Sequence, residues 1–325
     1  MNSFGRIFSL SIYGESHGKA IGIVVDGCPP GIPLKEEDFA TDLDRRKSGA
    51  KGTTPRTEED KPFIMSGVFN GMTTGAPIHV MFQNTNMRSQ DYDQLKDTPR
   101  PGHADYVAQL KYKGFNDHRG GGHFSGRLTL SLVAAGVVAK KIIPKISIKA
   151  RLIEAGGQTN ISAAVDKALE SGDSVGGIVE CRVNHVPAVL GEPFFDSLES
   201  QLSHICFSIP AIKGIEFGSG FKAAAMKGSE HNDTIFADGT TKTNHAGGIN
   251  GGISNGNELV FRVAVKPTSS ISMRQQTANL SSGEMLDLEI KGRHDACIAL
   301  RVPVVLEAVT AVVLADNVLL ANSKY

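Results

Sequence analysis

The feature that most constrains the fold of this chain is a pattern that occurs twice. Residues 22–34, a β-branched run followed by a proline-rich turn, are echoed by residues 177–193. Gly67-Val68-Phe69-Asn70-Gly71, which precedes a strand-like run at 78–82, is echoed by Gly252-Ile253-Ser254-Asn255-Gly256 before a run at 259–265. A segment rich in glycine, arginine and histidine precedes a long apolar stretch at 119–143 and again at 292–321.

Three loose matches in the same order favour an internal duplication over chance similarity among glycine-rich turns. We therefore expect one α+β domain over residues 1–325, built from pseudo-symmetric halves of roughly 1–150 and 151–325.

Strands and helices are predicted to alternate in both halves. Short β-branched runs at 22–25, 78–82, 177–181 and 259–265 indicate strands, and two of them alternate polar and apolar residues. Apolar tracts at 128–143 and 302–321 indicate helices. Glu307 and Asp316 interrupt the second tract, which favours a buried core helix over a membrane span.

Charge and cysteine content exclude several classes of protein. Lys plus Arg and Asp plus Glu both number 34, so no global basic field points to nucleic acid or to an anionic membrane. Any anion must be bound by local clustering. The four cysteines are scattered, which argues against a disulfide framework or a metal site, and no secretory signal is evident at the start. We expect a cytoplasmic protein.

Five polar motifs stand beside glycine or proline, although no nucleotide-binding glycine pattern is present. Each alone is ambiguous, because a turn histidine is commonly solvated and a charge run or an Arg-Asp pair is commonly a surface feature. The motifs are Gly14-Glu15-Ser16-His17-Gly18, Asp44-Arg45-Arg46-Lys47, Arg100-Pro101-Gly102-His103-Ala104-Asp105, Lys266-Pro267-Thr268-Ser269-Ser270 and Gly292-Arg293-His294-Asp295-Ala296-Cys297.

Together with the stretches at 25–34, 88–92 and 244–249, the motifs that contain His17, His103, Lys266 and Asp295 resemble chorismate synthase over nearly the whole chain. The resemblance implies a β-α-β sandwich with central helices between two sheets, assembled as a homotetramer. It also implies an anti 1,4-elimination of phosphate from 5-enolpyruvylshikimate 3-phosphate. Reduced FMN (FMNH2) is required without net redox change, and an external, NADP-linked flavin-reducing system is expected to supply it.

The resemblance assigns roles to individual residues. His103 is expected to share a proton with the leaving phosphate, His17 to maintain the flavin's protonation state, and Asp295 to assist proton transfer at the flavin. Predicted substrate ligands are Ser16, Arg45, Arg46, Arg100, Arg127 and Arg293. Predicted flavin contacts are Arg46, His123, Phe124, Ser125, Gly251, Lys266, Pro267, Thr268, Ser269, Ser270 and Arg293.

The chain departs from the family pattern at residues 123–128, where His123-Phe124 stands in place of an expected Arg-Ser. A protonated His123 could donate to an anion, and Phe124 could pack against a flavin edge. Lys51 is expected to replace a missing arginine as a point charge. Two alternatives stay open at this point: a flavin-dependent reductase, and a non-catalytic paralogue that binds anions or flavin.

Overall fold

Two antiparallel sheets form the outer layers of the protein, whose computed structural model describes residues 2–54, 59–85, 96–290 and 294–324. The first sheet has the strand order β1 (Ser3–Phe4), β2 (Ser9–Gly14), β3 (Ala20–Asp26), β7 (Ile78–Gln83) and β4 (Phe63–Ser66). The second has the order β10 (Ile212–Phe217), β13 (Leu259–Val265), β9 (Gly177–Asn184) and β8 (Ser147–Ala155).

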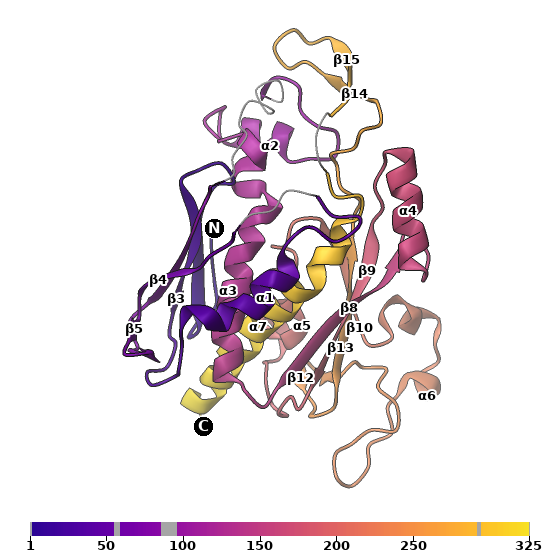
Figure 1. The fold of residues 1–325 in the computed structure, drawn as a ribbon. Helices are drawn as coiled ribbons and strands as arrows, with labels where there is room; N and C mark the ends of the chain where they lie inside the picture. Colours follow the sequence, from indigo (N-terminus) through magenta and orange to yellow (C-terminus); the bar gives the residue numbers. More distant parts are fainter. Residues whose placement is uncertain (1, 55–58, 86–95, 291–293, 325) are drawn as a thin grey trace.

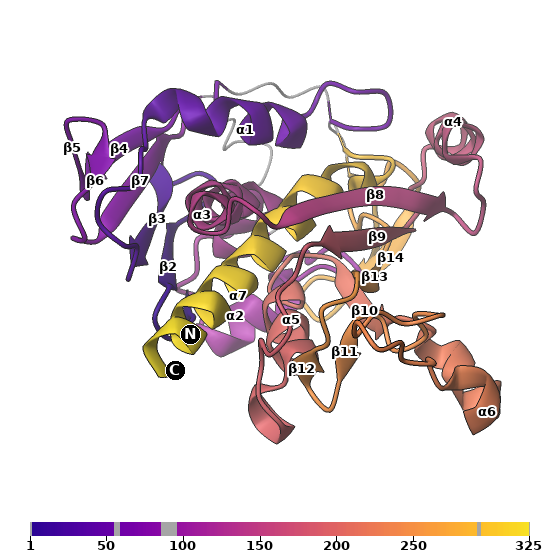
Figure 2. The same ribbon diagram turned by 90° about the horizontal axis from the view of Figure 1, so that it is seen from below.

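Two apolar helices lie between the sheets (Figures 1 and 2). α3 (Thr129–Ile142) packs on β3, α7 (Val302–Lys324) packs on β8, and the helices pack on each other. A Cβ on Gly136 would stand 2.3 Å from the Cβ of Ala308, so glycine allows the close approach of the two helices. The predicted β-α-β sandwich with central helices is therefore confirmed.

α7 is long and apolar enough to cross a membrane, but most of it is buried inside the protein. It is apolar on every side because sheet, helix and loops surround it. Its two interrupting carboxylates have partners. Glu307 pairs with Arg45, and Asp316 accepts the backbone N–H groups of residues 6–8 at 2.8–3.1 Å.

Shorter elements connect these layers. The helices are α1 (Ala40–Arg46), α2 (Asp105–Lys111), α4 (Ile161–Ser171), α5 (Leu198–Cys206) and α6 (Gly228–His231). The hairpins are β5 (Val68–Phe69) with β6 (Met72–Thr73), β11 (Ile249–Asn250) with β12 (Ile253–Ser254), and β14 (Gln275–Ala278) with β15 (Met285–Leu288). The 3₁₀ turns are η1 (Glu36–Phe39), η3 (Arg119–Phe124), η4 (Gly126–Leu128), η5 (Phe194–Asp196), η6 (Gly220–Ala225) and η7 (Ile298–Arg301).

The two halves repeat one topology. Strand order β2-β3-β7-β4 in the first sheet corresponds to β8-β9-β13-β10 in the second. Along the chain, α1 lies between β3 and β4, and α5 lies at the equivalent place between β9 and β10. The halves end with α3 and α7. The boundary expected near residue 150 falls inside β8, so the second half begins with that strand in this alignment.

One of the three sequence matches is shifted by four residues. Gly67, with φ +84°, precedes the first strand of its hairpin, whereas Gly252 lies in the turn of the equivalent hairpin. The structural counterpart of Gly67 is Gly248, with φ +87°. A Cβ on Gly67 would come 2.6 Å from the Cα of Ile78, the first residue of β7, and a Cβ on Gly248 would come 2.9 Å from the Cα of Leu259, the first residue of β13. Both turns therefore require glycine.

The outer face of the second sheet carries a row of alternating charges, here called the charge ladder. It runs Arg151–Glu180–Arg262–Glu216, with neighbours directly opposite each other on β8, β9, β13 and β10. The closest ion-pair distances along it are 3.4, 3.0 and 3.2 Å. Arg182 adds a contact to Glu180 at 2.8 Å.

Candidate active site

A cavity of about 620 Å³ opens at the N-terminal ends of the two central helices. Arg301, which lines it, directly precedes α7, and Arg127, which also lines it, stands two residues before α3. Because a helix N-terminus carries a partial positive charge and unsatisfied N–H groups, two converging N-termini favour anions.

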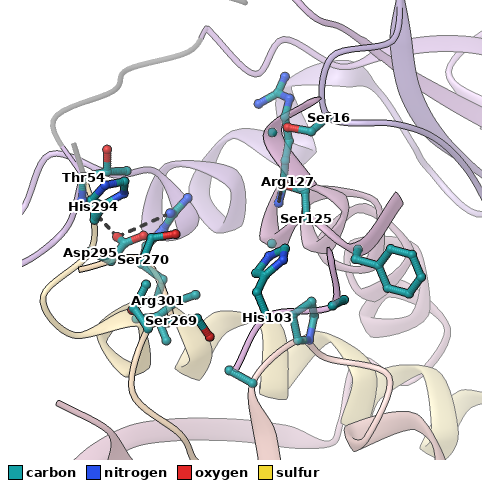
Figure 3. Close-up of a pocket in the computed structure, with 18 of the residues that line it drawn as sticks. Ser16, Thr54, His103, Ser125, Arg127, Ser269, Ser270, His294, Asp295 and Arg301 are labelled. Carbon is teal, nitrogen blue, oxygen red and sulfur yellow. Dashed lines mark hydrogen bonds and ion pairs between the residues drawn. The ribbon is translucent and has the colours of Figure 1, made fainter. Parts of the chain in front are cut away.

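Equivalent connections of the two halves surround this cavity. The loops that follow α1 and α5, the segments that follow β7 and β13, and the turns that precede α3 and α7 all contribute lining residues. The turn between β2 and β3 adds Ser16 and His17. The cavity therefore lies where the two halves meet. In the view of Figure 3, Ser16 and Arg127 lie on one side, and Ser269, Asp295 and Arg301 on the other.

Three consecutive glycines bring the two predicted catalytic histidines to one wall. Gly120, Gly121 and Gly122 all have positive φ. A Cβ on Gly120 would come 2.6 Å from Nε2 of the buried His17, and one on Gly121 would come 3.4 Å from the His103 ring. The loop can pass between these rings because it has no side chains.

His103 belongs to a buried hydrogen-bonded group. Its Nδ1 lies 2.5 Å from Oδ1 of Asp105. Arg100 donates to the same carboxylate, from Nη2 to Oδ1 at 2.8 Å and from Nε to Oδ2 at 2.7 Å. Nη1 of Arg100 donates to Ser270 Oγ at 3.1 Å. Burial raises the pKa of the Asp105 carboxyl, but the bonds from Arg100 and His103 outweigh it and hold that pKa well below its usual range. A carboxylate at Nδ1 orients the ring, so Nε2 is the atom suited to exchange a proton with a ligand.

Arg46 and Arg127 are held together by one carboxylate. Asp60 Oδ2 lies 3.3 Å from Nη1 of Arg46, and Oδ1 lies 2.9 Å from Nη1 of Arg127. Asn84 Oδ1 accepts from Nε of Arg127 at 2.6 Å. Arg301 donates to the carbonyl of Arg46 at 3.0 Å, which adds a third guanidinium. Sequence analysis missed Asp60 and Arg301.

Asp295 lies on the wall formed by the second half (Figure 3). Its Oδ1 accepts the backbone N–H of Thr54 at 3.0 Å and lies 3.7 Å from Nη1 of Arg301. The neighbouring His294 also lines the cavity, and burial, with the charge of Arg100, lowers its pKa. The predicted ligand Arg293 falls outside the described residues.

The segment 266–270, which is predicted to contact a flavin, lines the cavity. The Lys266 ammonium donates to the carbonyl of Gly102, and Ser269 Oγ donates to the same carbonyl at 2.8 Å. These bonds tie the segment to the loop that carries His103. The hydroxyl oxygen of Thr268 is buried without a hydrogen-bond partner among the described residues.

Four of the predicted residues either do not line the cavity or are bonded to other groups of the protein. Arg45 does not line this cavity, because its Nη1 and Nη2 bind both oxygens of Glu307 at 2.6 and 2.8 Å. Arg45 therefore lies apart from the other predicted substrate ligands, and its substrate role stays a prediction. Gly251 lies in the turn between β11 and β12 and does not line the cavity either. Lys51 pairs with Asp166 at 2.6 Å. His123 lines the cavity, but its Nδ1 faces the Gly14 carbonyl at 2.8 Å.

The remaining predicted residues come together around the cavity. They are Ser16, His17, Arg46, Arg100, His103, His123, Phe124, Ser125, Arg127, Lys266, Pro267, Thr268, Ser269, Ser270 and Asp295. Among the described lining residues, six are Lys or Arg and two are Asp. A net-neutral chain thus concentrates positive charge here, beside two histidines placed for proton transfer.

Comparisons with known proteins agree on one family. The model of the family described as chorismate synthase matches residues 8–319. A chorismate synthase from Chitinophaga pinensis is 65% identical over 322 residues, covering 98% of this chain and 97% of the relative. One from Dehalococcoides mccartyi is 46% identical, covering 99% and 97%. A solved chorismate synthase structure matches with a TM-score of 0.73 at 26% identity, covering 98% of this chain and 93% of the other.

Proposed function

Because this chain belongs to the chorismate synthase family, we propose that its cavity binds 5-enolpyruvylshikimate 3-phosphate and eliminates phosphate from it to give chorismate. The observation that carries the proposal is the convergence of His17, His103 and Asp295 on one cation-rich cavity. Neither a flavin-dependent reductase nor a non-catalytic paralogue is favoured by the comparisons.

The charges of the cavity suit this substrate. It carries two carboxylates and a phosphate, and the excess of cations around the cavity offsets their mutual repulsion. Arg46 and Arg127 are held in fixed positions by Asp60, so little ordering entropy is lost when an anion binds. Ser16 and Arg100 complete the proposed substrate side, with Arg100 acting chiefly by holding Asp105.

In the proposed reaction, Nε2 of His103 shares a proton with the departing phosphate, while Asp105 holds the imidazole through Nδ1. General acid catalysis of this kind contributes typically ~100- to 10,000-fold. His17 and Asp295 are proposed to hold and move protons at the flavin. Asp295 is kept in place for this by Thr54 and Arg301.

The residues present fit a flavin. The orphaned hydroxyl oxygen of Thr268 needs a partner, Lys266 and the serine hydroxyls of the same segment offer donors, and Phe124 offers an apolar edge. We therefore propose that reduced FMN binds along residues 266–270 and 123–125. The chemistry supplied by the bound flavin is a transient donation of electron density that is returned, so nothing is oxidised overall.

A homotetramer, a cytoplasmic location and an external, NADP-linked flavin-reducing system complete the proposal. The homotetramer is carried over from the resemblance to the family, the reducing system follows from the need for reduced FMN, and the cytoplasmic location is supported by the scattered, unpaired cysteines.

The deciding experiment is anaerobic incubation of the purified chain with dithionite-reduced FMN and 5-enolpyruvylshikimate 3-phosphate. Chorismate absorbance and released phosphate should rise in equal amounts. No chorismate under these conditions would sink the proposal, and consumption of reduced nicotinamide in proportion to product would favour the reductase. His103→Ala should slow turnover far more than it weakens FMN binding, and equal losses in both would contradict the role given to His103.

A further inference from the structure

Equivalent loops of the two halves present opposite chemistry to the cavity. The last residue of α1, Arg46, and the loop after it line the cavity with Lys47, Ser48, Thr54 and Asp60. The loop after α5, at the same place in the second half, contributes Phe207, Ser208, Pro210 and Ala211. The first loop therefore gives the cavity a charged and polar wall, and the second, at the same position in the repeated topology, gives it a largely apolar wall.

Phe207 is the conspicuous member of the apolar wall. Its side chain is 52% exposed, although it lines the cavity. Its backbone is fixed, because its N–H closes the last turn of α5 on the carbonyl of Ser203 at 3.0 Å. Ser208 holds the next position by donating its hydroxyl to the carbonyl of Ile205 at 2.6 Å. A large exposed phenyl group on a rigid backbone is suited to meet an apolar surface of a ligand.

The apolar wall is also tied to the segment proposed to hold the flavin. The carbonyl of Ala211 accepts the backbone N–H of Lys266 at 2.9 Å. Ala211 adopts φ +75°, a conformation that a non-glycine residue takes only when its surroundings impose it. The bond to Lys266 is one such constraint, so the wall and the hydroxyl-bearing segment 266–270 are set relative to each other.

We propose that Phe207 is a flavin-positioning residue, against whose ring the flavin ring system packs. The inference rests on the proposed function, because it concerns the cofactor of that same cavity. The substrate, with its two carboxylates and its phosphate, matches the charged wall. A planar, largely apolar ring system matches a phenyl group, with which it forms an offset or edge contact. The difference between the two loops thus places the charged groups of the substrate at the loop after α1 and the flavin ring system at the loop after α5.

The test is a fluorescence titration of oxidised FMN into the purified full chain, without substrate. Phe207→Ala should weaken FMN binding on the order of tenfold, because an aromatic contact and its buried area are lost. Phe207→Tyr should bind FMN as the wild type does, since it keeps the ring. The matched control is Phe195→Ala, which removes a phenyl that is 94% exposed and does not line the cavity, and it should change nothing.

Calorimetric titration with 5-enolpyruvylshikimate 3-phosphate alone separates the two ligands. Phe207→Ala should leave that affinity within twofold of the wild type. Unchanged FMN binding would overturn the inference, and so would a loss confined to the substrate, or a change only in sedimentation, which would make Phe207 a contact between copies. A wild-type chain that binds no FMN would overturn it too. A wild type that binds FMN but forms no chorismate would refute the proposed function and leave the role of Phe207 to be judged by the titration.

Discussion

Replacing Asp105 by asparagine tests the buried group around His103. The side chains of Arg100 and Asp105 are only 7% and 8% exposed, so removal of the carboxylate charge leaves a buried guanidinium without its counter-ion. Breaking a buried pair in this way costs about 3–5 kcal/mol. Because the isosteric amide keeps one acceptor, we expect the free energy of unfolding to fall by about 3 kcal/mol.

The same substitution should remove most of the catalytic advantage of His103. An amide can donate to Nδ1, whereupon the neutral ring presents Nε2–H, a much weaker acid than imidazolium. We expect Asp105→Asn to lower kcat by ~100- to 10,000-fold, the range typical of general acid catalysis, with little change in FMN affinity.

Urea unfolding followed by circular dichroism and single-turnover chorismate formation measure the two effects separately. Asp105→Glu, which keeps the charge, is the control and should unfold closer to the wild type. A kcat within threefold of the wild type for Asp105→Asn would refute the reasoning, because the carboxylate would then be dispensable for proton transfer.

Three further changes probe other parts of the site. Gly120→Ala forces a Cβ to 2.5 Å from Cδ2 of the buried His17 ring at φ +60°, so urea unfolding should show a loss of at least about 1–2 kcal/mol and turnover should fall. Wild-type turnover would show that the loop adjusts to the extra methyl group. Arg45→Met removes the bidentate partner of Glu307, but Arg45 is 43% exposed and Lys140 stays 3.7 Å from the carboxylate, so the chain should lose only about 1–2 kcal/mol in stability. Titrations should show unchanged affinity for FMN and substrate. Weaker substrate binding would restore its substrate role. Burial lowers the pKa of His294 below its ordinary 6.5, so the unfolded chain binds more protons just below that pH and stability falls as pH drops through this window. His294→Gln should flatten that slope in urea unfolding at pH 5–7, and an unchanged slope would contradict the assignment.

Much of the fold could be predicted because its periodicity is local. The strands at 78–82 and 259–265 and the two apolar helices are visible in the pattern of apolar residues, and they were confirmed. The repeated pattern at 67–71 and 252–256 was recognised, but its second copy was aligned four residues late, and the hairpins that it forms were not predicted. Both Gly248 and Gly252 have positive φ in neighbouring turns, so glycine content alone does not identify the equivalent one.

The remaining errors concern direction and distance rather than residue type. Arg45 and Arg46 are adjacent on α1, and a helix turns by about 100° per residue, so one faces Glu307 and the other the cavity. The run of charged residues at 44–47 does not indicate which of the two arginines faces the cavity. Arg301 was missed because it stands directly before the apolar tract at 302–321, outside any polar motif. Asp60 was missed because its partner Arg127 is distant in the sequence.

The charge ladder bears on how the second sheet aligns during folding. The inward residues of β9 are Val179, Cys181 and Val183, which are all small and apolar, so a two-residue slip of a neighbouring strand would still bury acceptable side chains. On the outer face, a slip toward the C-terminal end of β9 would place Arg151 of β8 or Arg262 of β13 opposite Arg182 instead of Glu180. Like charges in direct opposition are destabilising. The charge ladder on the outer face thus selects one of several strand alignments that the hydrophobic core alone would accept.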